Sequence, residues 1–313
     1  MKVKKRWVIP GVMVLIAAGL YVGNRSGNGA GRPKLLAHRG IAQTFPLDGV
    51  GNDTCTATRI NPPDHAYIEN TLPSMRAAFA AGADAVEFDV QVSADNQLVV
   101  FHDSTLECRT DGRGTVKEHT LAELRQLDLG YGYTADHGAT FPLRGKGRGM
   151  LVTVPEVVAA FPGRELLLDL KNDDAAEAGR LREFLDTLPP ERLETIAVYG
   201  GGDVVVGGKV RSASKQTMKN CLLAYEGIGW TGHVPDACRH TELHLPQRYG
   251  RFLWGWPNRF VDRMRDADTR VVLVAGDGPW SEGFDDAEAM RQVPDGWSGW
   301  LWSNRVDRIQ VGR

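Results

Sequence analysis

The sequence predicts an α/β fold, a (β/α)8 barrel with inserted loops at its catalytic face, preceded by an N-terminal membrane-targeting segment. Two observations indicate this fold: short apolar runs alternate with segments of helical periodicity, and polar residues follow several of those runs directly. In a barrel of parallel strands the carboxyl ends meet at one face, where the active site is built. The roughly 280 residues after the first 33 match the size of one such barrel.

Strands are expected where runs rich in Leu, Val and Ile end at glycine, proline or polar residues. These runs cover residues 34–37, 85–90, 98–101, 166–170, 195–199, 221–225, 270–275 and 299–303. Two further runs, 242–245 and 251–256, compete for the same positions in the barrel. Helices are expected over residues 71–81, 121–127, 154–161, 174–188, 258–266 and 285–291. Asn70 provides a capping-type start for the first of them.

Residues 1–33 are interpreted as a targeting segment with a short linker, and residues 34–313 as the barrel domain. Lys2, Lys4, Lys5 and Arg6 precede an apolar run over residues 7–22. As a helix this run reaches only about 24 Å, short of a hydrocarbon core of roughly 30 Å. It therefore fits a signal peptide or a short uncleaved anchor, and the poor cleavage site favours the anchor. The barrel is then exported and held at the extracytoplasmic, for instance periplasmic, face of the cytoplasmic membrane.

The charge of the predicted barrel domain excludes nucleic acid as its main partner. Of the chain's 37 basic residues six lie within residues 1–33, which leaves 31 against 39 acidic residues and a net charge of −8. Binding to nucleic acid depends on basic surface, so an acidic domain argues against it. No protein partner can be inferred from the sequence.

Carboxylates at the ends of two expected strands predict a metal site. Side chains alternate faces along a strand, so Glu87 and Asp89 point to the same side. Asp169 and Lys171 repeat this arrangement after another apolar run. Buried carboxylates of like charge are costly unless a cation neutralises them, and their oxygens suit Mg²⁺ or Ca²⁺. His38 and His102 also follow apolar runs directly, which places them at the same face.

The motifs in this part of the chain resemble those of the glycerophosphodiester phosphodiesterase family. They are His38-Arg39-Gly40, Glu69-Asn70-Thr71, Glu87-Phe88-Asp89 and His102-Asp103, and the resemblance is strongest from residue 34 to about residue 171. It implies a barrel enzyme that hydrolyses glycerophosphodiesters to glycerol 3-phosphate and an alcohol during phospholipid degradation. The glycerol 2-hydroxyl would attack first and form a cyclic phosphate, which water then opens.

The resemblance also implies a role for each matching residue. Glu87, Asp89 and Asp169 would bind one divalent ion, Mg²⁺ or Ca²⁺, and His38 and His102 would shuttle protons, with their separate roles left open. Substrate contacts would come from Arg39 and Lys171, which hold the phosphate, and from Glu69, a hydrogen-bonding carboxylate. The partner would be a small-molecule phosphodiester.

Two departures from the family pattern concern the site. The third ligand is usually Glu in a Glu-x-Lys pattern, whereas this chain has the shorter Asp169. The stretch between His-Arg-Gly and Glu-Asn-Thr is usually short, but here residues 41–68 intervene. This stretch is rich in Pro, Gly and Asn and is therefore expected to be a loop. A loop of this length at the catalytic face is expected to shape the substrate pocket.

Two other functions compete with this interpretation. One is a barrel phospholipase of the D or C type acting on lyso or intact phospholipids, which membrane proximity and tryptophan content favour. The other is a non-catalytic binding protein on the same scaffold, which the presence of both histidines and all three carboxylates disfavours. Most tryptophans are expected in the core, but Trp230, after Gly227 and Gly229, is a candidate for an apolar or choline-contacting wall of the site.

The four cysteines are expected to form the disulfides Cys55–Cys108 and Cys221–Cys238, because export permits oxidation. The first would tie the loop over residues 41–68 to the segment after His102, and the second would close a short excursion. Four free buried thiols are the alternative. None of the cysteines has the CxxC spacing of a zinc site.

Overall fold

The computed structural model describes residues 19, 22–24, 27, 29, 31–51, 54–172, 174–200, 210–276, 282–309 and 311. The predicted targeting segment over residues 7–22 lies outside the described residues except for Gly19 and Val22. Among the helices in the described part of the chain, none combines the length and the apolar character needed to cross a membrane.

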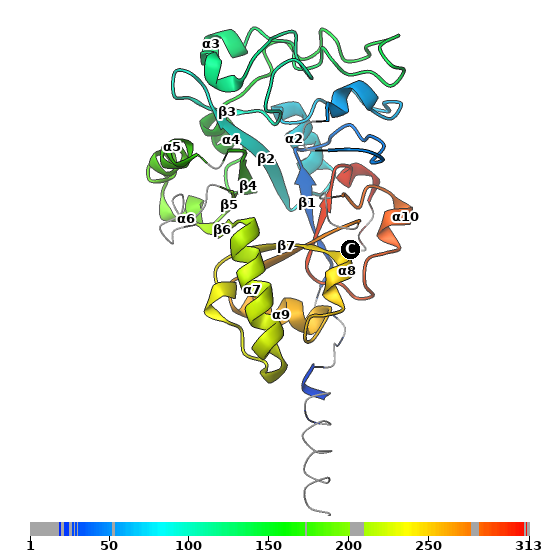
Figure 1. Ribbon diagram of the computed structural model, residues 1–313, viewed down its shortest axis with the longest axis vertical. Helices are drawn as coiled ribbons and strands as arrows, with labels where there is room; N and C mark the ends of the chain where they lie inside the picture. The colour runs from blue at the N-terminus through cyan, green and yellow to red at the C-terminus, as the bar shows by residue number, and fades with distance from the viewer. Residues whose placement is uncertain are drawn as a thin grey trace, which may run out of the picture.

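Eight parallel strands form a nearly closed barrel, as predicted (Figure 1). They are β1 (Lys34–His38), β2 (Ala85–Val92), β4 (Glu165–Leu170), β5 (Ile196–Tyr199), β6 (Arg211–Ala213), β7 (Glu242–Pro246), β8 (Arg270–Val274) and β9 (Trp300–Ser303). Their order in the sheet is β6-β5-β4-β2-β1-β9-β8-β7. A single parallel bridge between Ser212 and Thr241 joins the two edges, β6 and β7.

Three of the strand predictions are wrong. Residues 221–225 lie within helix α7 (Lys215–Ile228), and residues 251–256 form turns. The predicted strand over 98–101 is β3 (Leu98–Val100), but it pairs antiparallel with β2 and lies outside the barrel. The barrel positions predicted for residues 98–101 and 221–225 are instead occupied by two other strands. One is β7, which matches the additional candidate 242–245, and the other is β6, which was not predicted.

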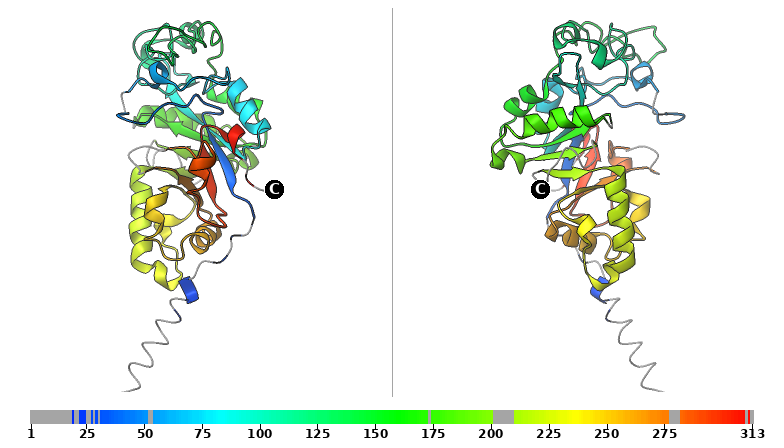
Figure 2. Two further views of the ribbon diagram at one scale, coloured as in Figure 1. Left: turned by 90° about the vertical axis from the view of Figure 1, so that its right-hand side faces the viewer. Right: turned by 60° about the vertical axis from the view of Figure 1, so that its left-hand side comes forward.

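The helices cover the outside of the barrel and follow its strands along the chain (Figure 2). They are α2 (Leu72–Ala80), α3 (Leu121–Leu124), α4 (Val154–Ala160), α5 (Ala175–Leu185), α6 (Pro190–Leu193), α7, α8 (Gln247–Gly250), α9 (Asn258–Asp266) and α10 (Ala287–Met290). Capping boxes at Thr71, Thr120, Thr153 and Ser214 begin four of them. The cap of α2 is thus Thr71, which leaves the Asn70 side chain free for another contact.

Three apolar clusters hold this architecture together. Leu36, Leu167, Val272 and Trp302 belong to the cluster inside the barrel. A larger cluster lies between strands and helices and includes Phe88 and Phe260. A third, around β3, supports the long insertion between β3 and α4. Apolar packing in the middle of the barrel leaves polar side chains to its two ends.

Both predicted disulfides, Cys55–Cys108 and Cys221–Cys238, are present, and none of the four cysteines is free. The first ties the loop over residues 41–68 to the segment after β3, at the carboxyl end of the barrel. The second joins α7 to the 3-10 helix η5 (Asp236–Cys238), just before β7. Two disulfides are typical of a protein outside the cytoplasm.

Replacing Cys55 and Cys108 together by serine is expected to lower the free energy of unfolding by about 2–4 kcal/mol. Catalytic turnover should fall as well, because this disulfide fixes a loop that lines the cavity described below. Denaturant unfolding and steady-state kinetics measure the two effects.

The matched control is Cys221→Ser with Cys238→Ser, which should lose stability while retaining turnover. Peptide mapping without reductant should recover both disulfide-linked pairs. A Cys55–Cys221 peptide, or four free thiols, contradicts this pairing.

Candidate active site

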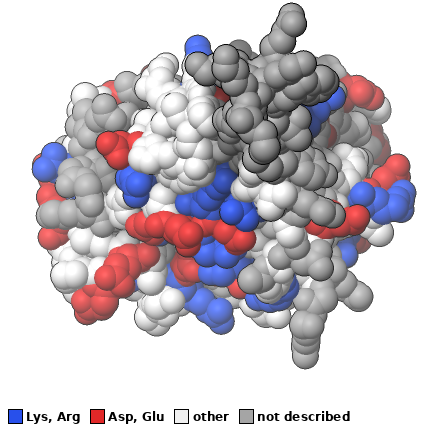
Figure 3. Space-filling view, turned by 90° about the horizontal axis from the view of Figure 1, so that it is seen from below, with Lys and Arg blue, Asp and Glu red and all other residues white. Residues whose placement is uncertain are grey.

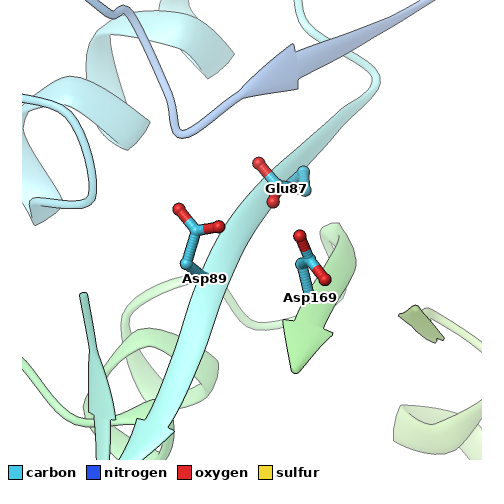
Figure 4. A group of neighbouring side chains, drawn as sticks. All are labelled: Glu87, Asp89 and Asp169. Carbon is cyan, nitrogen blue, oxygen red and sulfur yellow. The ribbon is translucent and has the colours of Figure 1, made fainter. Parts of the chain in front are cut away.

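The register of three neighbouring strands brings the predicted site residues together. His38 of β1 lies opposite Glu87 of β2, and Asp89 of β2 lies opposite Asp169 of β4. All four point into the carboxyl end of the barrel because each lies an even number of positions from an interior apolar residue of its own strand. Figure 4 shows the three carboxylates directed toward a common space.

The carboxylates of Glu87, Asp89 and Asp169 form a candidate metal centre. One oxygen from each lies within 4.8 Å of the others. Burial and the charges of Asp89 and Asp169 raise the pKa of Glu87 well above its usual value. Burial and the charge of Asp89 likewise raise the pKa of Asp169, despite the nearby Lys171. The buried Oε1 of Glu87 and Oδ1 of Asp89 accept no hydrogen bond from the described residues. A divalent cation fits this donor set, since such ions bind hard carboxylate oxygens.

Two basic side chains form ion pairs with Asp89. The Nε of Arg39 lies 2.9 Å from Asp89 Oδ2, and the Nζ of Lys171 lies 3.3 Å from Asp89 Oδ1 and 3.2 Å from Asp169 Oδ2. Burial alone would raise the pKa of Asp89, but the nearby positive charges, of which Arg39 is the strongest, together outweigh burial and lower it. Asp89 is therefore the carboxylate that stays ionised, and Arg39 and Lys171 are cations at the rim of the metal centre.

The backbone conformation of Arg39 and Asn70 supports this arrangement, and the contribution of Asn70 was not predicted from the sequence. Arg39 and Asn70 both have a φ of 59°, in the left-handed region. In this conformation the Arg39 N–H donates to Glu87 Oε2 at 3.0 Å. The Asn70 amide donates to Asp89 Oδ2 at 2.7 Å and accepts from the Asp89 N–H at 3.2 Å. Asn70 thus orients Asp89. This role was missed from the sequence because Asn70, next to Thr71, was assigned only to the start of a helix.

A chain of hydrogen bonds fixes the orientation of His38. Asp285 accepts from the Asn304 side-chain N–H at 2.7 Å, from its backbone N–H at 2.7 Å and from the Ser303 hydroxyl at 3.0 Å. The Asn304 amide oxygen is thereby turned toward His38 Nδ1, 2.7 Å away. Nδ1 must then carry the proton, which leaves Nε2 as the acceptor facing the site. Burial and the charge of Arg39 lower the pKa of His38 well below its usual value, so it is neutral near pH 7.

His102 is supported by a carboxylate instead of an amide. Its Nδ1 lies 2.6 Å from Asp103 Oδ1, and Asp103 Oδ2 lies 2.8 Å from Arg109 Nε. Arg109 Nη1 in turn lies 2.5 Å from Glu69 Oε1, and Glu69 lies 3.6 Å from Arg39. Burial and the charge of Arg39 lower the pKa of His102. Burial opposes ionisation of Asp103, yet Arg109 and His102 lower its pKa.

Arg109→Met is expected to lower the free energy of unfolding by about 3–5 kcal/mol, because Glu69 and Asp103 would be left buried without their shared cation. Arg109 is only 4% exposed. The control Arg148→Met removes an ion pair with Asp111 whose arginine side chain is 60% exposed, and it should cost less than about 1 kcal/mol. Urea unfolding of both variants measures the difference. Equal costs would show that the buried chain of charges contributes nothing beyond a surface pair.

A cavity of about 280 Å³ opens beside these groups. His38, His102, Glu87, Asp169 and Lys171 line its floor. One wall comes from the loop over residues 41–68, as the sequence predicted, through Ala42, Gln43, Phe45, Leu47, Val50, Gly51, Thr54 and Thr56. The opposite wall comes from later strands through Tyr199, His244 and Trp302, which sequence reasoning did not assign to the site.

Among the tryptophans that the structure describes, Trp302 lines this cavity and Trp230 does not. Its ring lies 4.5 Å from the His38 ring, centroid to centroid. Trp230 lies in the 3-10 helix η4 (Gly229–Thr231), beyond the carboxyl end of α7, whereas Lys215 at the start of α7 lines the cavity. The 14 residues of α7 separate the two positions by roughly 20 Å. The structure therefore does not place Trp230 in the substrate site.

Comparison with known proteins finds similarity to the same family that the motifs resemble. A sequence model described as the glycerophosphoryl diester phosphodiesterase family matches residues 38–220, more than half of the chain. A glycerophosphodiester phosphodiesterase of Bacillus altitudinis is 31% identical over 140 residues, which cover 44% of this chain and 45% of that protein. The matched part thus spans less than half the length of the curated relatives.

Solved structures share the fold. The glycerophosphoryl diester phosphodiesterase domain of an uncharacterized protein from Mycobacterium tuberculosis superposes with a TM-score of 0.62 at 18% identity, covering 88% of this chain and 97% of that one. A phosphodiesterase of Oleispira antarctica, solved in complex with the product sn-glycerol-3-phosphate, gives a TM-score of 0.55 at 19% identity and covers 88% and 94%. At these identities the likeness shows the fold alone.

Proposed function

The chain belongs to the glycerophosphoryl diester phosphodiesterase family, and from this premise we propose that it hydrolyses glycerophosphodiesters to glycerol 3-phosphate and an alcohol. The observation that carries the proposal is the cavity at the carboxyl end of the barrel, which is lined by His38, His102, Glu87 and Asp169, with Asp89 completing the carboxylate cluster. A relative of the same fold is described as holding sn-glycerol-3-phosphate as its product, which fits this reaction.

We propose that Glu87, Asp89 and Asp169 hold one divalent ion, Mg²⁺ or Ca²⁺. One oxygen from each lies within 4.8 Å of the others, and the buried Glu87 Oε1 accepts no hydrogen bond from the described residues, which supports a cation at this place. When bound, such an ion neutralises phosphate oxygens as negative charge builds up on them. Asp169 is one methylene shorter than the usual Glu, yet one of its oxygens still lies within 4.8 Å of oxygens of Glu87 and Asp89.

The two histidines divide the proton transfers in this proposal. His38 is backed by the neutral amide of Asn304 and presents an unprotonated Nε2, so it takes the proton from the attacking hydroxyl. His102 is backed by the carboxylate of Asp103, which favours the protonated ring against the opposing effects of burial and Arg39, so we assign to it the proton given to the leaving alkoxide. Asn304 and Asp103 are positioning residues, since they act through the histidines.

Arg39 and Lys171 are proposed to bind the phosphate. Both line the cavity, and their positive charges face the space between the carboxylates and the histidines. Glu69 also lines the cavity, but its carboxylate pairs with Arg109 and Arg39, so its proposed role is to orient Arg39 toward the phosphate. Basic side chains at this point stabilise the charge that develops on the phosphoryl oxygens.

We place the barrel outside the cytoplasm, in keeping with its two disulfides. Anchoring by residues 7–22, and the division into a targeting segment over 1–33 and a barrel domain over 34–313, remain predictions from the sequence.

Substrate profiling with and without a chelator tests the proposed function. The purified chain is offered glycerophosphocholine, glycerophosphoethanolamine, lysophosphatidylcholine and phosphatidylcholine, and the products are identified. We expect glycerol 3-phosphate from the first two, and no product after chelation. Exclusive cleavage of the lipids, or binding of all four without turnover, contradicts the proposal.

A barrel phospholipase of the D or C type is the second candidate. It is favoured by the apolar side chains Phe45, Leu47 and Val50, which the inserted loop contributes to the cavity wall and which could contact an acyl chain. Release of choline or of phosphocholine from intact phosphatidylcholine in the same experiment would support it.

A further inference from the structure

Five apolar side chains are exposed at the amino-terminal end of the barrel, opposite the cavity. We call them the basal apolar patch: Leu223 (58% exposed), Ile228 (42%), Trp230 (42%), Phe252 (57%) and Trp254 (40%). They come from the second half of α7, from η4 and from the turn after α8. The Trp254 indole N–H donates to the Glu226 carbonyl of α7 at 2.9 Å, which joins these elements into one surface. Exposed tryptophans grouped in this way indicate an interaction surface.

The chain leaves the barrel toward its N-terminus beside this patch. Arg263 donates to the Gly23 carbonyl at 3.2 Å and to the Asn24 side-chain oxygen at 3.0 Å. The same guanidinium donates to the Gly229 carbonyl at 3.1 Å, next to Trp230. The Asn24 side chain donates to the Trp230 carbonyl at 3.0 Å. Arg263 therefore holds residues 23 and 24, which directly follow the apolar run ending at Val22, against the patch.

We propose that the basal apolar patch lies in the headgroup region of a lipid bilayer, so that the barrel stands on the membrane by its amino-terminal end. Tryptophan favours this region because its ring is apolar while its N–H is polar. The apolar run over residues 7–22, with four basic residues before it, leads into the same surface.

The charged cavity at this end of the barrel does not provide the contact. Its volume is about 710 Å³, and both acidic and basic side chains line it. Figure 3 shows acidic and basic side chains next to one another on this end of the molecule. Its four arginines are already paired: Arg32 with Asp84, Arg211 with Asp268, Arg265 with Asp262, and Arg270 with Glu165 and Glu242. A lipid phosphate would have to displace these carboxylates, so the membrane contact is assigned to the apolar patch.

This orientation turns the catalytic cavity away from the bilayer. Residues 22–24 lie at one end of the molecule, and the insertion that carries α3 lies at the other (Figures 1 and 2). Since α7 runs from the cavity to the patch, the cavity lies roughly 20 Å above the membrane surface. The substrate class is then water-soluble glycerophosphodiesters, and lipids embedded in the same bilayer are out of reach. This last step rests on the proposed function.

Quenching of tryptophan fluorescence by brominated phospholipid tests the orientation in the full chain. The chain carrying Trp7→Phe, which removes the tryptophan of the apolar run, is reconstituted into phosphatidylcholine and phosphatidylglycerol vesicles with and without bromine. We expect bromine to quench its emission. Adding Trp230→Phe and Trp254→Phe, which keep the patch apolar, should abolish the quenching and leave hydrolysis of glycerophosphocholine unchanged.

Each outcome bears on one proposal. Equal quenching before and after the two patch substitutions, or none in the Trp7→Phe chain, overturns the membrane contact even if hydrolysis proceeds. A detergent-solubilised dimer that Trp230→Ser with Trp254→Ser converts to a monomer would assign the patch to a second copy of the chain, which also overturns it. Quenching without any hydrolysis would leave the orientation standing and contradict the proposed function. Cleavage of bilayer phosphatidylcholine by the reconstituted chain contradicts the inferred substrate class.

Discussion

Replacing His38 or His102 by alanine is expected to lower kcat by about 10²- to 10⁴-fold on glycerophosphocholine, the range that a positioned acid or base contributes. Both rings line the cavity, and both Nδ1 atoms are held by an acceptor, Asn304 for His38 and Asp103 for His102. The loss should fall on kcat more than on KM, because the phosphate is bound by other groups. Steady-state kinetics measure the effect, and circular dichroism checks that the fold is kept.

A diester with an activated leaving group separates the two histidines. A p-nitrophenolate needs no proton as it leaves, so such a substrate should restore much of the turnover of His102→Ala and little of that of His38→Ala. His233→Ala is the control, since this histidine is exposed near the amino-terminal end of the barrel and should keep normal kinetics. Rescue of His38→Ala alone would reverse the two assignments. Near-normal turnover of either variant on glycerophosphocholine would remove that histidine from the mechanism.

The part of the site that could be predicted from the sequence is the part built from strand ends. His38, Glu87, Asp89 and Asp169 each follow a buried apolar run, and the parallel register of β1, β2 and β4 then brings them to one place. Alternation along β2 was enough to put Glu87 and Asp89 on the same face. The structure brings these residues together as expected, together with Arg39, Lys171, Glu69 and His102.

The residues that orient the histidines could not be predicted, because their partners are far apart in the chain. His38 and Asn304 are 266 positions apart, and Asn304 depends in turn on Asp285. Trp302 was one of several tryptophans with no signal to distinguish it. It reaches the cavity only because β9 pairs with β1 and closes that side of the barrel. Trp230 was predicted to line the substrate site because glycines precede it, but these glycines lie at the end of α7.

The errors in the fold have a local cause. The run Cys221-Leu222-Leu223-Ala224-Tyr225 is as compatible with a helix as with a strand, since a short apolar run has no distinguishing period. In the structure a capping box at Ser214 begins α7, with Thr217 in place of the usual Glu or Gln. Strand β6 is only three residues long, Arg211–Ala213, and two of them are polar. Its place is decided by pairing with β5 and not by its own composition.

Removal of divalent metal is expected to abolish hydrolysis. Adding back Mg²⁺ or Ca²⁺ separately should restore it, and the ion that restores more activity is the preferred one. The ion should stabilise the folded chain as well, by about 2.7 kcal/mol at a hundredfold excess over its Kd. Thermal unfolding with chelator and with added ion measures this increment without reference to activity. Turnover that survives thorough chelation contradicts a metal-dependent reaction.

Glu87→Gln is expected to change stability in opposite directions with and without the ion. Glu87 is 1% exposed, and burial with the charges of Asp89 and Asp169 already raises its pKa, so its ionised form is costly without a cation. Glutamine removes that charge and keeps an oxygen that can accept the Arg39 N–H. The metal-free variant should therefore unfold at a higher temperature than the metal-free parent, yet gain little when ion is added. Glu288→Gln, whose side chain is 83% exposed, should behave like the parent in both states. A Glu87→Gln chain that gains as much stability from the ion as the parent would take Glu87 out of the metal centre.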